Sequence, residues 1–271
     1  MVYADPVDVE LASGEFYDRL SVPFYLSPDK LAGDYSPVRF ERELRLFTTH
    51  CRGGAVLDVG CSTGGFLFQL TNRHPGSYAV TGTDVAGAAL DYAASHGIAV
   101  VHTPFLESDF DGRRFDAITF WAVMEHLIEP AKFLRHAVSL LKPGGYCFVL
   151  VPNLKSLAVR LLGRKYRYIM PDHVNYFASA TLAKFVAAEA DLKIVQSGSS
   201  HFNPLVILKD LRGSAERVGD AARAGLLKRT NAYKQNPWLA PAKWLYSATE
   251  RALRFAGLAD NLFVVLRKKL P

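Results

Sequence analysis

The sequence predicts an α/β domain with a largely parallel sheet, and three observations support this fold class. Helical and strand patterns alternate from about residue 36 to residue 200, as βαβ units require. A glycine-rich turn follows the first clear strand pattern. A final strand-like run, residues 261–269, stands behind a long helical stretch. With 271 residues, of which 49% are hydrophobic and 21% charged, the chain can bury one large core.

The expected strands are short runs rich in Val, Ile, Phe and Tyr, which suit a pleated surface. They lie at residues 55–60, 78–84, 98–103, 114–121, 145–151, 192–198 and 261–269. The helices repeat apolar residues at intervals of three or four. They are expected from Ser36-Pro37 onward, at 64–72, 88–95 and 130–141, and from Ser179 to Ala190. Ser36 can cap the first helix, with Pro37 in its first turn.

Two stretches interrupt this alternation and divide the chain. Residues 153–178 separate the fifth strand from its helix, and residues 201–258 form a mostly helical insertion before the last strand. Both begin where parallel strands end, on the ligand side of such a sheet, so we expect them to form a lid over the site. The predicted organisation is an N-terminal cap segment (1–35), a main domain (36–200 and 259–271) and the inserted lid (201–258).

The basic residues are unevenly placed. The formal net charge is +6, and residues 201–258 alone hold ten basic and four acidic residues. The segment at 153–178 combines leucines with arginines and a lysine-arginine run. These patterns suit an anionic or lipid-linked small molecule, or peripheral contact with an anionic membrane. A packed helix with a solvated basic face would produce the same pattern, so both hypotheses stay open.

The ends and the cysteines of the chain predict a reduced, cytoplasmic protein. The N-terminus does not have the basic start and apolar run of a secretory signal, and no window of 18 residues is continuously apolar. Cys51, Cys61 and Cys147 are odd in number and widely spaced, which fits neither a disulfide framework nor a paired metal motif. If the basic segments contact a membrane, we expect its inner face.

The strongest chemical motif is the run from Val56 to Gly65, VLDVGCSTGG. Asp58 lies near the end of an apolar strand, and glycines then make a sharp turn into a helix, where they let a ligand approach the backbone closely. Ser62 stands where a dinucleotide-binding loop would carry its second glycine. A carboxylate at this turn suits a ligand with an ammonium group better than a pyrophosphate. An ordinary strand–helix turn is the alternative.

A second acidic residue, Asp84, ends the next strand, 24 residues after Gly60. An acidic side chain at this point can accept hydrogen bonds from both hydroxyl groups of a ribose. The alternative is a simple helix N-cap, because a helical run follows. The spacing from the glycine turn favours the ribose hypothesis.

With LDVGCSTGG, TGTDVAG, FDAITFWAVMEHLIEP and LLKPGG in this order, the chain resembles the class I S-adenosylmethionine-dependent methyltransferases. Within them it is similar to the ubiquinone-biosynthesis O-methyltransferases and related small-molecule enzymes. The resemblance runs from about Ser36 to Ser197 and includes residues 261–269. It implies a Rossmann-like sheet of seven strands with an antiparallel last strand and helices on both faces. It also implies S-adenosylmethionine as the methyl donor, with S-adenosylhomocysteine as its product.

The resemblance also implies individual roles. It places the glycine loop at the methionine part of the cofactor, Asp84 at the ribose, Phe105-Leu106 at the adenine, and Trp121 beside the cofactor. Arg39 resembles an arginine near the cofactor carboxylate. The expected cofactor-binding residues are Arg39, Asp58, Gly60, Cys61, Gly64, Asp84, Val85, Phe105, Leu106 and Trp121.

The chain departs from the family pattern at three places. Ser62 replaces a commoner glycine. Relatives that hold a metal beside this site carry an acidic residue three positions before the Glu-His pair, where this chain has Ala122, so we expect no metal. Residues 201–258 exceed what the quinone enzymes carry, so a quinone acceptor does not follow from the resemblance.

Transfer of a methyl group to a hydroxyl requires a base, and His126 and His173 are the candidates, since both follow strands on the ligand side. The alternatives are that His126 orients a loop and that His173 caps the segment leading into the next helix. We expect O-methylation of a small-molecule acceptor. A nicotinamide-dependent oxidoreductase and a non-catalytic S-adenosylmethionine-binding module are the rival hypotheses. Nucleic acid is not an expected partner, because WAVMEH replaces the Asn/Asp-Pro-Pro-aromatic run of DNA amino-methylating enzymes.

Overall fold

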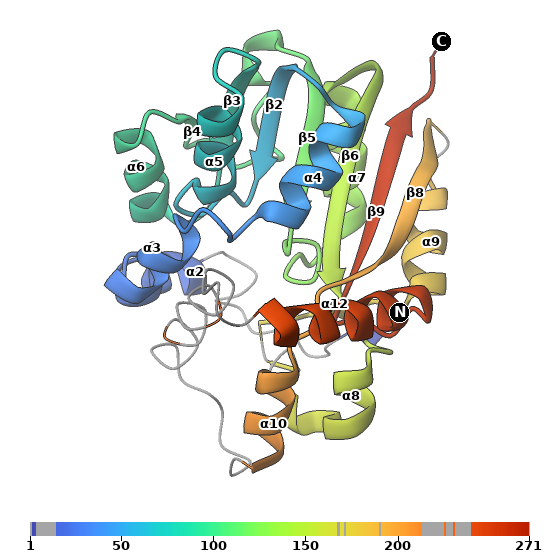
Figure 1. Cartoon of the computed structure of the whole chain (residues 1–271). Coiled ribbons are helices and arrows are strands. Elements are labelled where there is room, and N and C mark those ends of the chain that lie inside the picture. Colours follow the sequence, from blue (N-terminus) through green and yellow to red (C-terminus); the bar gives the residue numbers. More distant parts are fainter. Residues whose placement is uncertain are drawn as a thin grey trace.

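A computed structural model describes residues 2–3, 15–166, 169–170, 172–189, 191–212, 225, 230 and 240–270. Its centre is a sheet of seven strands with helices on both faces (Figure 1). The strands lie in the order β4-β3-β2-β5-β6-β9-β8. Their bounds are β2 Gly54–Val59, β3 Tyr78–Thr83, β4 Ala99–Val101, β5 Phe115–Trp121, β6 Leu141–Pro152, β8 Leu192–Ser200 and β9 Asn261–Lys268.

Strand direction agrees with the predicted fold class. Strands β2, β3, β4, β5 and β6 pair in parallel, as short helical crossovers dictate. The last strand, β9, inserts between β6 and β8 and is antiparallel to both. The prediction of a mostly parallel sheet with an antiparallel last strand is confirmed.

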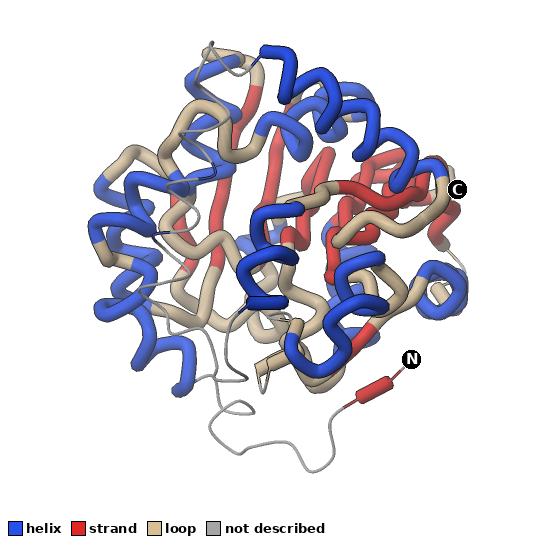
Figure 2. The backbone as a smooth tube through the Cα atoms, turned by 60° about the horizontal axis from the view of Figure 1, so that its bottom comes forward, coloured by secondary structure: helices blue, strands red, loops and turns tan. Residues whose placement is uncertain are grey.

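The helices form a layer on each face of the sheet, as Figure 2 shows from a second direction. Helices α4, α5 and α6 pack on one face, and α7 and α9 on the other. The helix bounds are α2 Glu15–Leu20, α3 Pro28–Asp34, α4 Glu41–His50, α5 Gly65–Arg73, α6 Gly87–Ser95, α7 Pro130–Leu140, α8 Leu157–Leu162, α9 Ser179–Ala187, α10 Pro204–Arg212 and α12 Ala240–Phe255.

Alternation along the strands explains the two cores. In β2, Leu57 and Val59 face α7 and α9, whereas Val56 faces α4 and α5. Successive strand side chains point to opposite faces, so each strand contributes to both cores. All three of these side chains are at most 3% exposed. Burial of a side chain of this size contributes about 1.5–3 kcal/mol.

The start of α4 differs from the sequence prediction. The expected helix begins at Ser36-Pro37, but α4 begins at Glu41. The carbonyl oxygen of Ser36 accepts hydrogen bonds from the backbone N–H of Arg39 and from Nε2 of Gln69 in α5. Residues 36–40 therefore form a turn docked on α5 instead of the first helical turn.

The inserted segments share a small core of their own. Ala158 and Leu162 of α8 pack with Tyr166, Phe202 and Ile207, so α8 and α10 lie together. Helix α12 packs against β8. Residues 213–224, 226–229 and 231–239 of the predicted lid lie outside the described residues. Among the helices in the described part of the chain, none has the length and apolar character that a bilayer crossing needs.

The N-terminal segment reaches back to the far half of the chain. Strand β1, Val2–Tyr3, pairs in antiparallel fashion with β7, Asn175–Tyr176. Helix α2 also lies near this region, because the hydroxyl of Tyr17 contacts the backbone oxygen of Asp172 at 3.4 Å. These contacts bring the N-terminal segment next to residues 172–176.

Candidate active site

The loop between β2 and α5 is a tight turn stapled to the end of β3. The backbone N–H groups of Gly60 and Cys61 both donate to the carbonyl oxygen of Thr83, at 2.8 and 3.1 Å. Gly60 has φ +73°, and a Cβ there would lie 2.5 Å from Cγ2 of Val123. A larger residue would therefore clash with the segment that follows β5, which explains the glycine.

Ser62 occupies the left-handed region with φ 49°. This conformation is strained for a non-glycine residue, by roughly 1–3 kcal/mol. The strain is offset in part because the Ser62 backbone N–H donates a 2.7 Å hydrogen bond to Oδ2 of Asp84. The replacement of glycine by serine therefore acts on backbone energy and leaves the course of the loop intact.

Asp84 follows β3 directly and is held by backbone groups. Besides Ser62, the N–H of Ala86 donates to its Oδ1 at 2.9 Å, so Asp84 acts as a local turn acceptor and also joins two loops. Burial raises the pKa of Asp84, and the hydrogen bonds from Ala86 and Ser62 oppose that shift. The structure is compatible with Asp84 both as a ribose acceptor and as a local cap, because each carboxylate oxygen can accept two hydrogen bonds.

Asp58 lies beneath the loop at the end of β2 and is 3% exposed. The hydroxyl of Thr119 on β5 donates a 2.6 Å hydrogen bond to its Oδ1. Burial raises the pKa of Asp58 to about 7; the bond from Thr119 opposes this shift and the carboxylate of Asp84 adds to it. A cation bound at the loop would favour the ionised form.

Close packing explains the rest of the loop. Gly64 has φ +77°, and a Cβ there would lie 2.9 Å from Cβ of Ala93 in α6. Cys61 is buried, and its sulfur would lie 2.6 Å from a Cβ on Gly82 of β3. Burial raises the pKa of the Cys61 thiol well above its ordinary value, which makes it inert at neutral pH.

Arg39 lies in the turn ahead of α4, beside the first residue of α5. Its Nε is 3.7 Å from Oδ1 of the buried Asp34, and its guanidinium lies over the ring of Phe40 at 4.8 Å. A Cβ on Gly65 would contact the backbone oxygen of Asp34 at 3.0 Å, so this turn abuts the start of α5. Arg39 is therefore near the glycine loop.

The expected adenine and ribose contacts differ in exposure. Val85 is 56% exposed and Leu106 38%, but Phe105 is only 5% exposed. The ring of Phe105 stacks on Phe133 of α7, with centroids 5.5 Å apart, inside the hydrophobic core. Of the pair Phe105-Leu106, Leu106 is therefore the residue accessible to a ligand.

Trp121 ends β5 on the face that carries α4 and α5. Its ring meets Phe66 of α5 edge-on, with centroids 5.3 Å apart. Its Nε1 is buried and has no hydrogen-bond partner among the residues that the structure describes. Ala122 follows with φ 58°, so the chain turns sharply after the strand.

That turn leads to His126, which is held by its ring nitrogen. Nδ1 of His126 lies 2.8 Å from the backbone oxygen of Asp172 and 3.0 Å from the hydroxyl of Tyr17. A carbonyl oxygen only accepts, so this geometry puts the ring proton on Nδ1 and the lone pair on Nε2. Neutral imidazole in this tautomer has the lone pair that a general base needs.

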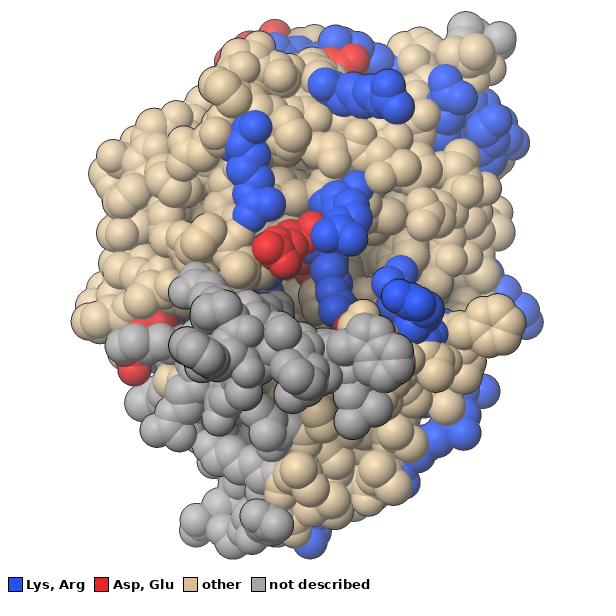
Figure 3. Space-filling model, viewed as in Figure 1, with Lys and Arg blue, Asp and Glu red and all other residues tan. Residues whose placement is uncertain are grey.

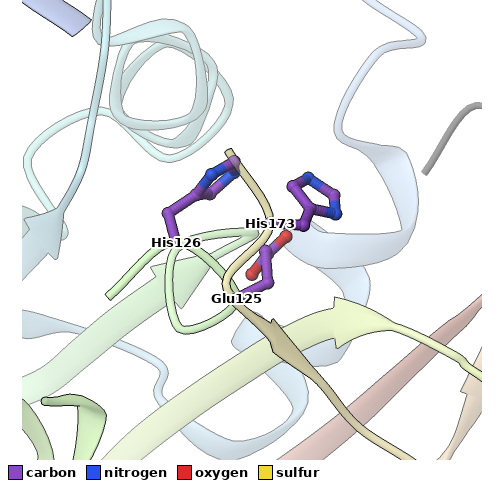
Figure 4. A group of neighbouring side chains, drawn as sticks. All are labelled: Glu125, His126 and His173. Carbon is purple, nitrogen blue, oxygen red and sulfur yellow. The ribbon is translucent and has the colours of Figure 1, made fainter. Parts of the chain in front are cut away.

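His173 and Glu125 complete a compact cluster with His126. The two imidazole rings are perpendicular, with centroids 4.6 Å apart. Glu125 is 1% exposed, and neither of its carboxylate oxygens has a hydrogen-bond partner in the described part of the chain. Burial raises its pKa to about 8, and Asp172 adds to that shift. Figure 4 shows Glu125 and His126 on the loop after β5, with His173 on a separate segment.

These three residues also form the group with metal-ligand geometry among the residues that the structure describes. One ligand atom from each of Glu125, His126 and His173 lies within 4.8 Å of the others. The sequence predicted no metal because Ala122 stands where metal-binding relatives have an acidic residue. His173, from a distant part of the chain, can nevertheless provide a third ligand atom beside those of Glu125 and His126. The cluster can therefore act in acid–base chemistry or hold a divalent cation.

The sequence did not reveal two residues that position this cluster, Asn175 and Tyr17, or the role of Glu125 as a member of it. Asn175 donates from Nδ2 to the backbone oxygens of Met124 and Leu127, and its N–H donates to the oxygen of Glu125, so it pins the loop. Tyr17 reaches His126 across 109 residues. No local pattern marks either contact. Glu125 had a visible signal, the Glu-His pair itself, but its burial is a tertiary property.

Residues 37–197, more than half of the chain, match the family model of a methyltransferase domain. The chain belongs to this family. The sheet, the glycine loop and the acidic residue after β3 are those of an S-adenosylmethionine-dependent methyltransferase, and that is the activity of the protein. The oxidoreductase and non-catalytic hypotheses are not supported.

Two of the similar proteins are named as O-methyltransferases. The chain is 32% identical over 192 residues to the ubiquinone biosynthesis O-methyltransferase of Alkalilimnicola ehrlichii, covering 64% of this chain and 76% of that one. It is 30% identical over 170 residues to the protein of the same name from Paraburkholderia phytofirmans, covering 58% and 72%.

Solved structures show the same fold at low identity. The cyclase SpnF superposes with a TM-score of 0.62 at 18% identity, covering 100% of both chains. The N-methyltransferase NodS of Bradyrhizobium japonicum WM9, solved with S-adenosyl-l-homocysteine, gives a TM-score of 0.54 at 15% identity, covering 93% of this chain and 98% of that one. Their names include a cyclase and an N-methyltransferase, so the fold alone does not choose the acceptor.

Proposed function

We propose that the protein transfers a methyl group to a hydroxyl of a small-molecule acceptor, with His126 as the general base. The observation that carries this proposal is the hydrogen-bond geometry at Nδ1 of His126, which favours the tautomer with a basic Nε2. A hydroxyl must lose its proton as it attacks a methyl carbon, so a base in this form suits an O-acceptor. The relatives named as O-methyltransferases support the same acceptor atom.

The residues around the loop fit S-adenosylmethionine. Gly60 has no side chain to block approach to the loop backbone, and the hydroxyl oxygens of Ser62 and Thr63 are buried without a partner among the described residues. We propose that Asp58, Gly60, Cys61 and Gly64 form the wall at the methionine part, with Arg39 near its carboxylate. Asp84 and Val85 would contact the ribose and Leu106 the adenine. Trp121, at the end of β5, would lie beside the cofactor.

S-adenosylmethionine supplies an electrophilic methyl group on a sulfonium, so the protein has to position the acceptor and remove one proton. His126 accepts that proton at Nε2, and the resulting imidazolium keeps its Nδ1 proton on the oxygen of Asp172. Tyr17 and Asn175 hold the ring and the loop in place. General-base catalysis of this kind contributes about 10²–10⁴-fold.

Metal-independent catalysis is part of the proposal, and the cluster at Glu125 provides its sharpest alternative. Glu125, His126 and His173 could instead hold a divalent cation that lowers the pKa of the acceptor hydroxyl. The two mechanisms differ in one measurable respect. A chelator that strips divalent cations leaves turnover unchanged when His126 is the base, whereas loss of turnover that Zn²⁺ or Mg²⁺ restores assigns the cluster to a metal.

A panel of acceptors tests the function itself. Formation of S-adenosylhomocysteine is measured with phenols, catechols, sugar alcohols and amines of similar size, with the protein and the donor held constant. The proposal expects turnover with a hydroxyl acceptor and a product methylated at oxygen by mass spectrometry. Turnover confined to amines would contradict it, since an uncharged amine already carries its attacking lone pair.

A further inference from the structure

A cavity of about 430 Å³ lies between α4, α12 and the ends of β5 and β8. Its volume falls within the range of small-molecule sites, roughly 300–1,000 Å³. The cavity is separate from the His126 cluster in its lining, but it includes Trp121, the residue from which the loop to Glu125 and His126 departs. Among the residues given a role above, Trp121 alone belongs to the lining of this cavity.

Two residues of the cavity lining carry a buried polar atom that has no hydrogen-bond partner among the described residues. These atoms are Nε1 of Trp121 and Oγ of Ser200. Ser200, the last residue of β8, is 7% exposed. A buried polar group without a partner costs about 1–3 kcal/mol, so these groups favour a ligand that accepts hydrogen bonds.

Two of the carboxylates in the lining already have basic side chains as partners. Glu250 of α12 forms a two-point ion pair with Arg42 of α4. Glu43 lies 2.8 Å from Nε2 of His201 and is 5% exposed. Burial opposes ionisation of Glu43, but His201 outweighs it and holds the pKa of that carboxyl at about 2. These pairs join the two walls of the cavity and leave one further carboxylate, that of Glu41, in the lining.

Three arginines in the lining have no such partner. Arg45 lies on α4, and Arg251 and Arg254 are one helical turn apart on α12. No carboxylate within the described residues comes within 4.0 Å of any of them, and Nε of Arg254 donates instead to the backbone oxygen of Ser199 at 3.3 Å. Figure 3 shows basic side chains gathered around acidic ones and a hollow between α4 and α12. Arginines on facing walls repel one another unless an anion lies between them.

We propose that this cavity binds the phosphate group of a small organic phosphate. This phosphate site does not depend on the proposed function. Arginine forks suit phosphate oxygens, and the arginines of α4 and α12 reach the cavity from two different helices, so they can bind different oxygens of a tetrahedral group. A single carboxylate could satisfy fewer of these donors.

The test uses inorganic phosphate as the probe, at constant ionic strength, on the full chain with S-adenosylhomocysteine bound. The expected result is saturable binding that weakens at least about tenfold in the double variant Arg45→Gln/Arg251→Gln. Arg114→Gln, an exposed arginine ahead of β5, is the matched control and should bind like the wild type. Binding that does not saturate, or that is equal in the double variant and the wild type, overturns the proposal.

The phosphate could belong to a soluble metabolite or to a lipid headgroup, and a second arm separates these sources. Sedimentation with phosphatidylcholine vesicles, with and without phosphatidic acid, is measured for the same variants. Vesicle binding that needs phosphatidic acid and both arginines assigns a headgroup, and phosphate binding without vesicle binding assigns a soluble ester. Vesicle binding that survives Arg45→Gln/Arg251→Gln, with no binding of inorganic phosphate, overturns the proposal. Failure to bind S-adenosylhomocysteine would contradict the proposed function instead.

Discussion

The backbone N–H of Ser62 and the side chain of Asp84 are joined by a 2.7 Å hydrogen bond, which ties the glycine loop after β2 to the end of β3. Residues 22 positions apart are thereby fixed as one surface. The same carboxylate also accepts from the N–H of Ala86. Its role in the loop and its proposed role at the ribose are therefore linked, and a substitution should affect both.

Asp84→Ala should weaken binding of S-adenosylhomocysteine by about 1–3 kcal/mol, because it leaves ribose hydroxyls unpaired in a partly dry site. Calorimetric titration measures this change directly. Asp91→Asn, an exposed acid on α6, is the control and should leave the affinity unchanged. Unchanged affinity in Asp84→Ala would show that Asp84 serves only the turn.

Affinity for the cofactor should rise with pH. Burial raises the pKa of Asp58 to about 7, and a cationic ligand at the loop favours the ionised carboxylate. Affinity is therefore expected to increase as pH rises from about 6 to 8 and then to level off. Asp58→Asn should remove this component while keeping any titration of the ligand itself. Parallel profiles for the wild type and Asp58→Asn would contradict the assignment.

His126→Gln should lower kcat by at least about 10²-fold with little change in cofactor affinity, since it removes the base and keeps the fold. Steady-state kinetics and calorimetry separate the two effects. Tyr17→Phe should cause a smaller loss, because Asp172 still holds Nδ1. His102→Gln, an exposed histidine, is the control. Full activity in His126→Gln would remove this residue from the mechanism.

Stability should fall as pH rises across the titration of Glu125. Burial raises its pKa from 4.5 to about 8, so between these values the folded protein holds a proton that the unfolded chain has lost. The folded state binds more protons in this window, and the free energy of unfolding therefore decreases with pH. Glu125→Gln should flatten the dependence and unfold later than the wild type at pH 8. Denaturant titrations at several pH values measure the free energy of unfolding of both proteins. The same dependence of that free energy on pH in both would contradict the prediction.

Gly82→Ala should destabilise the protein by about 1–3 kcal/mol through overpacking, because the new Cβ would lie 2.6 Å from Sγ of Cys61. Cys61→Ala removes that sulfur, so the double variant should recover much of the loss. Thermal unfolding of the two single variants and the double variant forms a complete cycle. A double variant whose loss equals the sum of the single losses would show that the two sites do not interact.

The class of fold and the main ligand loop can be predicted from the amino-acid sequence alone. Strand patterns at 55–60 and 78–84 lie on β2 and β3, and the glycine turn between them makes the left-handed and close-packed conformations that glycine permits. These are local properties, because hydrophobic period and turn chemistry depend on neighbouring residues. The predicted start of α4 at Ser36 was wrong because it depended on a local capping pattern. In the structure the Ser36 carbonyl oxygen instead accepts a hydrogen bond from Gln69 of α5.

Contacts between side chains that are distant in the sequence could be identified from the three-dimensional structure alone. His126 contacts Asp172, which is 46 residues away in the sequence, and Tyr17, which is 109 residues away. The ion pair between Arg42 and Glu250, 208 residues apart, joins α4 to α12. Phe105 and Leu106 are adjacent in sequence, yet one is packed in the core and the other is exposed. Such contacts arise when the chain closes around a shared core, and short-range periodicity carries no record of which distant segments that closure brings together.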